Sequence, residues 1–197
     1  MPSSEVRPLH VADTVVEGDT YPVYAYVLGH PDGLVLVDTG MIDTHPEIEN
    51  VYRPVLYPLT GQGVPLDEVA LVINTHLHFD HCGGNRLFPG TPIYVQRAER
   101  EAAREPDYTI PEWVEFEGAS YVELDGEAEI LPGIRVLPTP GHTPGHQSVL
   151  VDTDEGLVIV GGDVAHYLEE LEHEKRLLDL RPRRIWITHS PVPWEPP

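Results

Sequence analysis

A strand-length apolar run that leads straight into a histidine cluster restricts the fold of this chain more than any other feature. Residues 69–74 are almost continuously apolar, which is typical of a β-strand buried on both faces. Such a strand requires packed structure on both of its sides, so the chain should form a layered domain. The strand is followed at once by the hexapeptide HLHFDH at residues 76–81. We therefore predict that this hexapeptide lies at the end of a buried strand.

Other short apolar runs, separated by glycine, proline and aspartate, predict strands in both halves of the chain. These runs are residues 23–28, 34–38, 92–95, 120–124, 133–137, 147–151, 157–160 and 184–188. Residues 97–104 predict a short, mostly exposed helix, and residues 167–180 predict a helix with its leucines near one face. Residues 39–65 contain four prolines and three glycines, which predicts an extended loop. We expect a single domain, residues 1–197, with two packed sheets flanked by helices.

The charge of the chain excludes two classes of partner. It has 33 acidic and 12 basic residues, a formal net charge of −21, which opposes binding to a phosphate backbone or to an anionic membrane surface. Residues 1–7 lack the basic and apolar pattern of a secretory leader, and no apolar run reaches membrane-spanning length. We therefore expect a cytoplasmic protein that binds neither nucleic acid nor membrane.

The hexapeptide has the residue types of a metal site. Cys82 is the single cysteine, so a metal would rely on imidazole and carboxylate groups, which zinc, iron, cobalt and manganese accept. In an extended segment, His76, His78 and Asp80 point to one side, because side chains alternate along a strand. His81 joins them if the backbone bends beside the two glycines that follow Cys82. The alternative interpretation is a polar surface patch without a metal.

Three further candidate ligands follow predicted strands in the second half of the chain. They are His142 in TPGH, Asp163 in GGD and His189 in ITH. Each of them alone could be a turn or cap residue. Together with the four groups of the hexapeptide they make seven ligands, more than one four-coordinate metal ion would use, and this predicts two metal ions. His146 is expected to support the ligand loop through a hydrogen bond.

In this order of ligands the chain resembles the metallo-β-lactamase superfamily, whose mark is a His-x-His-x-Asp-His run followed by His, Asp and His. The segment VDTG at residues 37–40 is similar to that family too, and the resemblance covers nearly the whole chain. It implies an αββα sandwich, two mixed β-sheets flanked by helices, with the metals at one edge between the sheets. It also implies that Asp38 orients a ligand histidine. The implied ligands are His76, His78 and His142 for one metal, Asp80, His81 and His189 for the second, and Asp163 as a bridge.

Within the superfamily, the sequence motifs of this chain are most similar to those of the N-acyl homoserine lactonases. The shared segments are HLHFDH at residues 76–81, PIYVQR at 92–97 and GHTPGHQS at 141–148. The resemblance implies opening of a lactone ring, first of all that of an N-acyl homoserine lactone, by a hydroxide that bridges two divalent metal ions. Zinc is the first expectation, with iron, cobalt or manganese as alternatives, and Asp80 would deliver a proton. The partner would be a small lactone or ester, and the protein a monomer or homodimer.

The chain departs from the lactonase pattern close to the expected substrate. Those enzymes resemble one another in having a tyrosine three residues after the bridging aspartate, whereas here that position is His166, followed by Tyr167. Either residue could supply a hydrogen bond to the carbonyl oxygen, or lie on the surface at the start of a helix. The alternatives for the whole protein are a hydrolase of another ester, a thioester or a phosphoester, and a metal-binding protein of this fold without turnover.

Overall fold

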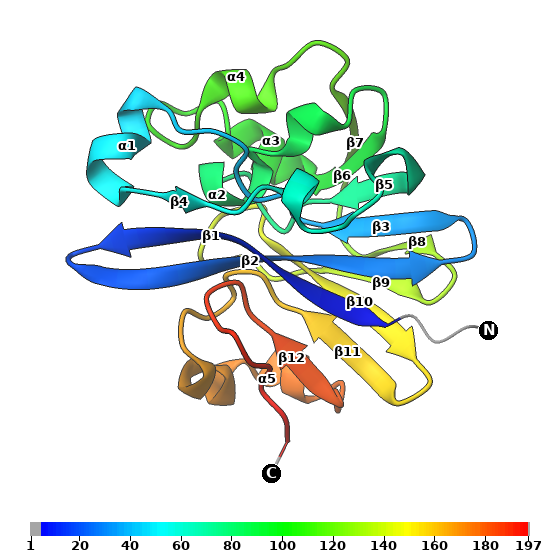
Figure 1. The fold of residues 1–197 in the computed structure, drawn as a ribbon. Helices are drawn as coiled ribbons and strands as arrows, with labels where there is room; N and C mark the ends of the chain where they lie inside the picture. The colour runs from blue at the N-terminus through cyan, green and yellow to red at the C-terminus, as the bar shows by residue number, and fades with distance from the viewer. Residues whose placement is uncertain (1–4, 197) are drawn as a thin grey trace.

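Two β-sheets packed face to face form the centre of the molecule, and helices cover the outer face of each sheet (Figure 1). The computed structural model describes residues 5–196. Residues 1–4, which open the N-terminal segment considered above, and residue 197 lie outside the described residues. The predicted αββα sandwich with two mixed sheets is confirmed.

The larger sheet has seven strands in the order β4-β1-β2-β3-β5-β6-β7. Their bounds are β1 Val6–Val16, β2 Asp19–His30, β3 Gly33–Val37, β4 Val55–Leu56, β5 Val69–Ile73, β6 Pro92–Gln96 and β7 Ser120–Leu124. The pairs from β4 to β3 are antiparallel, and the pairs from β3 to β7 are parallel. The parallel half therefore brings the carboxyl ends of β3 and β5 to the same edge of the sheet.

The smaller sheet has five strands in the order β12-β11-β10-β9-β8. Their bounds are β8 Ala128–Leu131, β9 Ile134–Pro138, β10 Gln147–Thr153, β11 Gly156–Val160 and β12 Arg184–Trp186. The strands β8 to β11 pair antiparallel, and β12 is parallel to β11. Since β9 and β11 are each antiparallel to β10, the strands β9, β11 and β12 run in one direction and end at one edge.

The helices are short, and Figure 1 places α1 to α4 over the larger sheet and α5 beside the smaller one. The α-helices are α1 Pro46–Tyr52, α2 Phe79–Cys82, α3 Arg97–Ala102, α4 Pro111–Val114 and α5 Lys175–Leu178. The 3-10 helices are η1 Leu59–Gly61, η2 Leu66–Glu68, η3 Asn85–Leu87 and η4 Leu168–His173. Within residues 5–196, no helix is long and apolar enough to cross a membrane.

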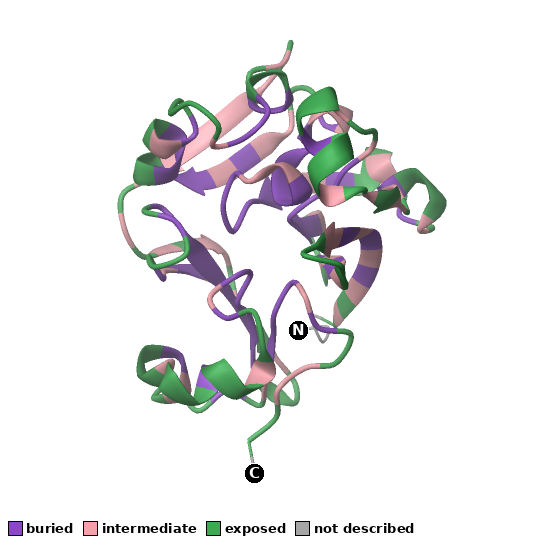
Figure 2. Ribbon diagram, turned by 90° about the vertical axis from the view of Figure 1, so that its left-hand side faces the viewer, coloured by how far each residue is buried: buried purple, intermediate pink, exposed green. Residues whose placement is uncertain are grey.

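The space between the sheets is filled by side chains from alternate strand positions. The inner side chains of β2, β3 and β5 meet those of β9, β10 and β11, and all of them are buried. They include Tyr26, Leu28, Val35, Val37, Leu71 and Ile73 from one sheet, and Val136, Val149, Val151, Val158 and Val160 from the other. Figure 2 shows these buried segments inside and the exposed ones on the outer helices.

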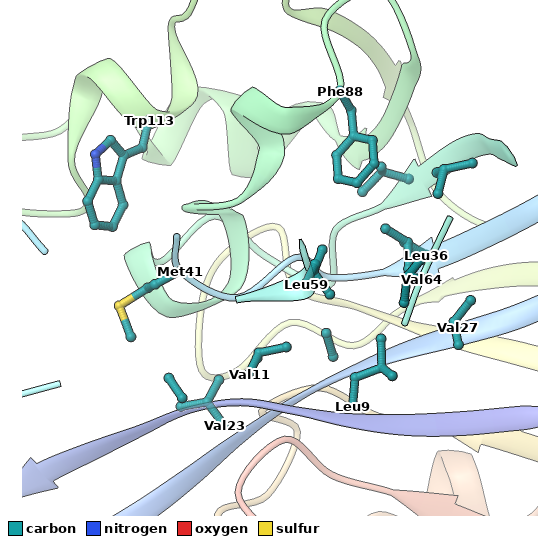
Figure 3. Close-up of a cluster of buried hydrophobic side chains, with 14 of the residues drawn as sticks. Leu9, Val11, Val23, Val27, Leu36, Met41, Leu59, Val64, Phe88 and Trp113 are labelled. Carbon is teal, nitrogen blue, oxygen red and sulfur yellow. The ribbon is translucent and has the colours of Figure 1, made fainter. Parts of the chain in front are cut away.

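A second buried cluster lies on the outer face of the larger sheet. In Figure 3, Phe88 lies above Leu36 and Trp113 lies above Met41, with Leu9 and Val27 on the strands beneath. The strand predicted from residues 69–74 is buried on both faces, because its side chains contribute alternately to this cluster and to the one between the sheets. The prediction of a central buried strand before the hexapeptide is therefore confirmed.

The helix predicted at residues 167–180 is wrong as a single element. The structure has η4 and then the one-turn helix α5, separated at Glu174, whose ψ of 61° lies outside the helical region. Four glutamates between residues 169 and 174 place like charges close together, which weakens a continuous helix. Leu171 and Leu177 are fully buried, so packing against the smaller sheet holds two short pieces in place of one helix.

The extended loop predicted at residues 39–65 is wrong in part, because it contains α1. Pro46 lies in the first turn of this helix, where a missing N–H is harmless and the fixed φ suits a helix. His45 caps the same end and accepts a hydrogen bond from Glu47 N at 3.3 Å. The strands predicted at residues 23–28 and 34–38 are confirmed as parts of β2 and β3, which pair antiparallel, but β1, which pairs with residues 19–28 of β2, was missed.

A hydrogen bond from a buried hydroxyl links the two sheets, and removal of that hydroxyl tests this packing. Tyr26 is fully buried, and its hydroxyl donates to the carbonyl oxygen of Ile187 at 3.0 Å. In Tyr26→Phe that carbonyl keeps only the longer hydrogen bond from Ser190 N, at 3.4 Å. We expect the free energy of unfolding to fall by about 1 kcal/mol, measured by urea denaturation. Tyr24→Phe, at a partly exposed position of the same strand, is the control. Equal losses in the two variants would contradict a specific link between the sheets.

Candidate metal centre

Five strands deliver polar side chains to one edge of the sandwich. In the larger sheet, β3 ends before Asp38 and β5 ends before the hexapeptide. In the smaller sheet, β9, β11 and β12 precede His142, Asp163 and His189. A backbone hydrogen bond of 2.9 Å from the nitrogen of residue 147 to the carbonyl oxygen of residue 75 joins the two sheets here. The shared strand direction within each sheet thus brings distant segments to one place.

The hexapeptide is a bend followed by one helical turn, and not the extended segment that the sequence predicted. β5 ends at Ile73 and α2 begins directly after His78, so Asp80 and His81 lie on a helix. On a helical turn, neighbouring residues diverge by about 100° instead of alternating, so both side chains can face the same centre.

The two glycines after Cys82 serve close packing and do not supply the expected bend. Gly83 has a φ of −60°, which any residue adopts. A Cβ on Gly83 would lie 2.8 Å from the ring of Trp113, and a Cβ on Gly84 would lie 2.5 Å from the carbonyl oxygen of Thr39. The covering segments therefore approach the backbone of α2 as closely as glycine allows.

Three imidazoles form the first group of candidate ligands. His78 Nδ1 lies 3.0 Å from His76 Nε2 and 3.1 Å from His142 Nε2. The ring of His76 is fully buried, whereas His142 is exposed, so this group extends from the core to the surface. Imidazole nitrogens this close to one another share either a proton or a cation.

Asp163 lies between this triad and a second group of ligands. Its Oδ2 is 3.5 Å from His142 Nε2 and 3.3 Å from His189 Nε2, and its Oδ1 is 3.4 Å from His81 Nε2. Asp80 Oδ2 is 3.7 Å from the same nitrogen of His81. The structure therefore brings all seven predicted ligands together, with Asp163 in the middle.

Burial keeps the histidines of the first group neutral. It lowers the pKa of His76 well below its ordinary value, lowers that of His142 as well, and lowers that of His78 to about 4. A neutral imidazole has a free lone pair, and this is the form in which histidine binds a metal. These three side chains can therefore accept a metal at neutral pH without first losing a proton.

The second group has the opposite electrostatic balance. Burial favours the protonated form of Asp163, but His81 and His189 outweigh it and hold the pKa of the carboxyl well below its ordinary range. Burial lowers the pKa of both histidines, but the charge of Asp163 outweighs it and raises the pKa of each. Among the described residues, the buried atoms His81 Nε2 and Asp163 Oδ1 have no hydrogen-bond partner. A divalent cation fits this arrangement, since it would replace the histidine protons.

Asp38 lies behind these ligands and orients one of them. Its carboxylate accepts hydrogen bonds from Thr75 N at 2.8 Å, from Thr75 Oγ1 at 2.7 Å and from His81 Nδ1 at 2.9 Å. Nδ1 of His81 therefore carries a proton, and Nε2 is directed toward Asp163. This is the position in which the sequence resemblance placed Asp38.

His146 supports the centre from the smaller sheet. Its Nε2 accepts a hydrogen bond from Asp163 N at 3.1 Å, and its Nδ1 contacts Thr139 Oγ1 at 2.9 Å. Burial lowers the pKa of His146 to about 3, so the ring stays neutral with its proton on Nδ1. The predicted support of the ligand loop is confirmed, and it extends to the backbone of Asp163.

A pocket of about 370 Å³ opens over the ligands. Five of the seven ligands form its floor, and its walls include Val16, Tyr21, Tyr52, Phe79, His166 and Tyr167. The structure thus places both His166 and Tyr167 beside the ligands. The hydroxyl of Tyr167 lies 3.0 Å from that of Tyr21, which comes from the hairpin of β1 and β2. A largely apolar wall over a polar floor suits a small ligand with an apolar part.

The order of the ligands along the chain agrees with a known family. Residues 18–195 match the family described as the metallo-beta-lactamase superfamily. The chain belongs to this superfamily. All seven candidate ligands lie inside the matched residues, so the metallo-β-lactamase match covers the whole centre and every strand except β1.

Several relatives of this chain within the superfamily are named N-acyl homoserine lactonases. An N-acyl homoserine lactonase from Bacillus cereus is 36% identical over 170 residues, which cover 78% of this chain and 68% of the relative. The N-acyl homoserine lactonase AttM from Rhizobium johnstonii is 31% identical over 191 residues, with the same coverages. A solved structure of an AiiA mutant from B. thuringiensis, with N-decanoyl-L-homoserine at its active site, is 27% identical with a TM-score of 0.83 and covers 96% of this chain and 94% of that chain.

Glu99 is a functional candidate that the sequence interpretation missed, because the helix at residues 97–104 was expected to be mostly exposed. Glu99 is fully buried, and its carboxylate joins two ligand loops. One oxygen accepts from Leu77 N at 2.8 Å and from the hydroxyl of Tyr108, and the other accepts from Thr143 Oγ1 at 2.7 Å and from Gly145 N at 3.1 Å. Leu77 lies between the first two ligands and Thr143 directly follows the third, so one side chain holds all three.

One signal for Glu99 was present in the sequence, although the helical pattern hid it. The residue follows β6, a strand that is parallel to β5 and ends at the same edge as the ligands. Close packing also points to the contact, because a Cβ on Gly145 would lie 2.1 Å from Glu99 N. Gly145 is therefore needed for the close approach of the loop that carries His142 to helix α3.

Glu99→Gln tests the role of this carboxylate. The amide NH₂ group cannot accept hydrogen bonds, so one pair of donors would face another donor. We expect the free energy of unfolding of the metal-free protein to fall by about 1–3 kcal/mol in urea denaturation. We also expect added zinc to bind about tenfold more weakly in competition with a chelator. Glu101→Gln, at an exposed position of α3, is the matched control. Unchanged stability and zinc binding in Glu99→Gln would contradict the role.

Proposed function

We propose that this chain is a dinuclear metal-dependent hydrolase that opens lactone rings, with N-acyl homoserine lactones as the first substrate class. The observation that carries the proposal is the cluster of seven histidine and aspartate groups, five of which form the floor of a largely apolar pocket. The lactonases from B. cereus and R. johnstonii, and the related structure with N-decanoyl-L-homoserine bound, support the same chemistry for this chain.

The proposed ligands divide into two sets around one carboxylate. His76, His78 and His142 would hold one divalent metal ion, Asp80, His81 and His189 a second, and Asp163 would contact both. Zinc is the first choice, and iron, cobalt or manganese would accept the same imidazole and carboxylate donors. When bound, two such ions supply Lewis acidity and lower the pKa of a water molecule toward about 7, so no side chain has to act as the nucleophile.

In the proposed reaction, a water oxygen bonds to the lactone carbonyl carbon and the ring C–O bond breaks. The ring oxygen takes up a proton, and the product is an open-chain hydroxy acid. Asp80, which faces the pocket and is 9% exposed, is the proposed carrier of that proton. Val16, Tyr52 and Phe79 would pack against the acyl chain and exclude bulk water from the reacting bond.

We propose Tyr167 as the hydrogen-bond donor to the lactone carbonyl oxygen, with His166 as the alternative. Both side chains line the pocket beside the ligands. The hydroxyl of Tyr167 contacts that of Tyr21 at 3.0 Å, so one of the two protons can serve this contact while the other points to the substrate. Tyr21 would then position Tyr167 without a contact of its own to the carbonyl.

The proposal also covers the domain organisation, the oligomeric state, the partners and the cellular location of the protein. Residues 1–197 would form one hydrolase domain that acts on a small-molecule substrate as a monomer or homodimer. The net charge of −21 supports the exclusion of nucleic acid and anionic membrane as partners. The single cysteine, Cys82, is buried, and a chain without disulfides suits the reducing cytoplasm.

A pH-stat screen of lactones, thioesters and phosphoesters, on protein of measured metal content, tests the function. We expect N-acyl homoserine lactones to be the best substrates. Asp80→Asn should lower kcat by about 100-fold or more, because a positioned acid or base typically contributes 10²–10⁴-fold. Asp179→Asn, at an exposed position far along the chain, is the matched control and should keep the wild-type kcat.

Two results of this screen would overturn the proposal in different ways. Turnover of thioesters or phosphoesters without turnover of lactones would replace the substrate class. No turnover of any substrate, with two metal ions bound, would favour a metal-binding protein without catalysis.

Tyr167→Phe tests the proposed carbonyl donor. Removal of one such donor should lower kcat for the best lactone by about 100-fold and leave KM nearly unchanged, because the hydrogen bond strengthens as charge develops on the oxygen. Steady-state kinetics measure both constants. Tyr57→Phe, whose hydroxyl bonds to Asp13, is the control. A wild-type kcat in Tyr167→Phe would exclude this role.

A further inference from the structure

His166 lies close enough to the centre to take part in it as a ligand. One nitrogen of its ring and the ligand atoms of Asp163 and His189 all lie within 4.8 Å of one another. Its ring centroid is 5.3 Å from that of His142 and 5.9 Å from that of His189. His166, Asp163 and His189 thus form a further set of mutually close ligand atoms, and His166 is the one member of this set that is not among the seven proposed ligands.

The backbone holds His166 in this place. Its N–H donates to the carboxylate of Glu170 at 2.8 Å, and the next N–H, that of Tyr167, donates to the same oxygen at 3.3 Å. Ala165, directly before it, is buried at 5% exposure. The segment between Asp163 and His166 is therefore anchored at both ends, one by the centre and the other by η4.

The ring of His166 has donor capacity that its surroundings do not use. Within residues 5–196, the hydrogen bond of this residue is made by its backbone nitrogen, and neither ring nitrogen bonds to another protein group. The residue is exposed on one side and lines the pocket on the other. An imidazole that lies beside a buried carboxylate and two other histidines is suited to bind a cation.

We propose that His166 is an additional metal ligand, which supplies a nitrogen beside Asp163 and His189 to the second metal ion. This inference rests on the proposed dinuclear function and deepens it. The second ion would then have five protein groups around it, Asp80, His81, Asp163, His166 and His189. Since the nitrogen of His166 would be engaged by the metal, Tyr167 remains as the donor to the substrate carbonyl.

Metal titration of the apoprotein separates this role from a merely structural one. His166→Phe and His166→Gln are compared with the wild type, and His173→Phe, another exposed histidine at the end of η4, is the matched control. Zinc is added in competition with a chromogenic chelator, and the visible spectrum of the cobalt-loaded protein reports the coordination. We expect the second equivalent of zinc to bind at least about tenfold more weakly in both His166 variants, with the first equivalent unchanged. The cobalt spectrum should change in these variants and not in the control.

The outcomes distinguish this inference from the function on which it rests. Two equivalents bound with wild-type affinity and an unchanged cobalt spectrum in both His166 variants would overturn the ligand role of His166, while the dinuclear proposal would stand. A wild-type protein that binds only one equivalent would overturn the dinuclear proposal itself. Urea denaturation of each metal-free variant shows that a change in affinity does not come from loss of the fold.

Discussion

Asp163 lies buried where the two sheets meet, with ring nitrogens of four histidines within 4.0 Å of its carboxylate. A carboxylate in this position costs several kcal/mol unless positive charge or hydrogen bonds compensate it. The charge therefore requires the histidines around it, and the histidines require strands that end at the same edge. The mixed pairing of both sheets meets that requirement, because it turns five strand ends toward a single point.

The ligands depend in turn on polar groups that never reach the pocket. Asp38 holds His81 through one hydrogen bond and the preceding loop through two more. Glu99 accepts three hydrogen bonds from the two loops that carry His76, His78 and His142, and a fourth from the hydroxyl of Tyr108. His146 fixes the backbone of Asp163 in the same manner. Because each acceptor binds backbone N–H groups of ligand loops, irregular segments acquire the rigidity that a metal centre needs.

Much of the fold and most of the centre could be predicted from the residues alone. The strands after which ligands follow were recognised, since apolar runs of strand length have a simple pattern. The short helices were predicted less well. α1 was hidden by prolines, one of which begins it, and residues 167–180 form two pieces because buried leucines and repelling glutamates prevail over the helical pattern. Periodicity describes an element by itself and contains nothing about what packs against it.

The sequence by itself determined the chemistry of this protein, because ligand type and order along the chain are properties of the residues. It placed seven imidazole and carboxylate groups after strands and thereby predicted a centre for two metal ions. Only the tertiary structure decided how these groups face one another. It showed that Asp80 and His81 lie on a helical turn. The contacts of Glu99 with Leu77 and Thr143, and those of His166 with His142 and His189, join segments far apart in the chain. Such contacts depend on packing in three dimensions, which no local pattern of residues records.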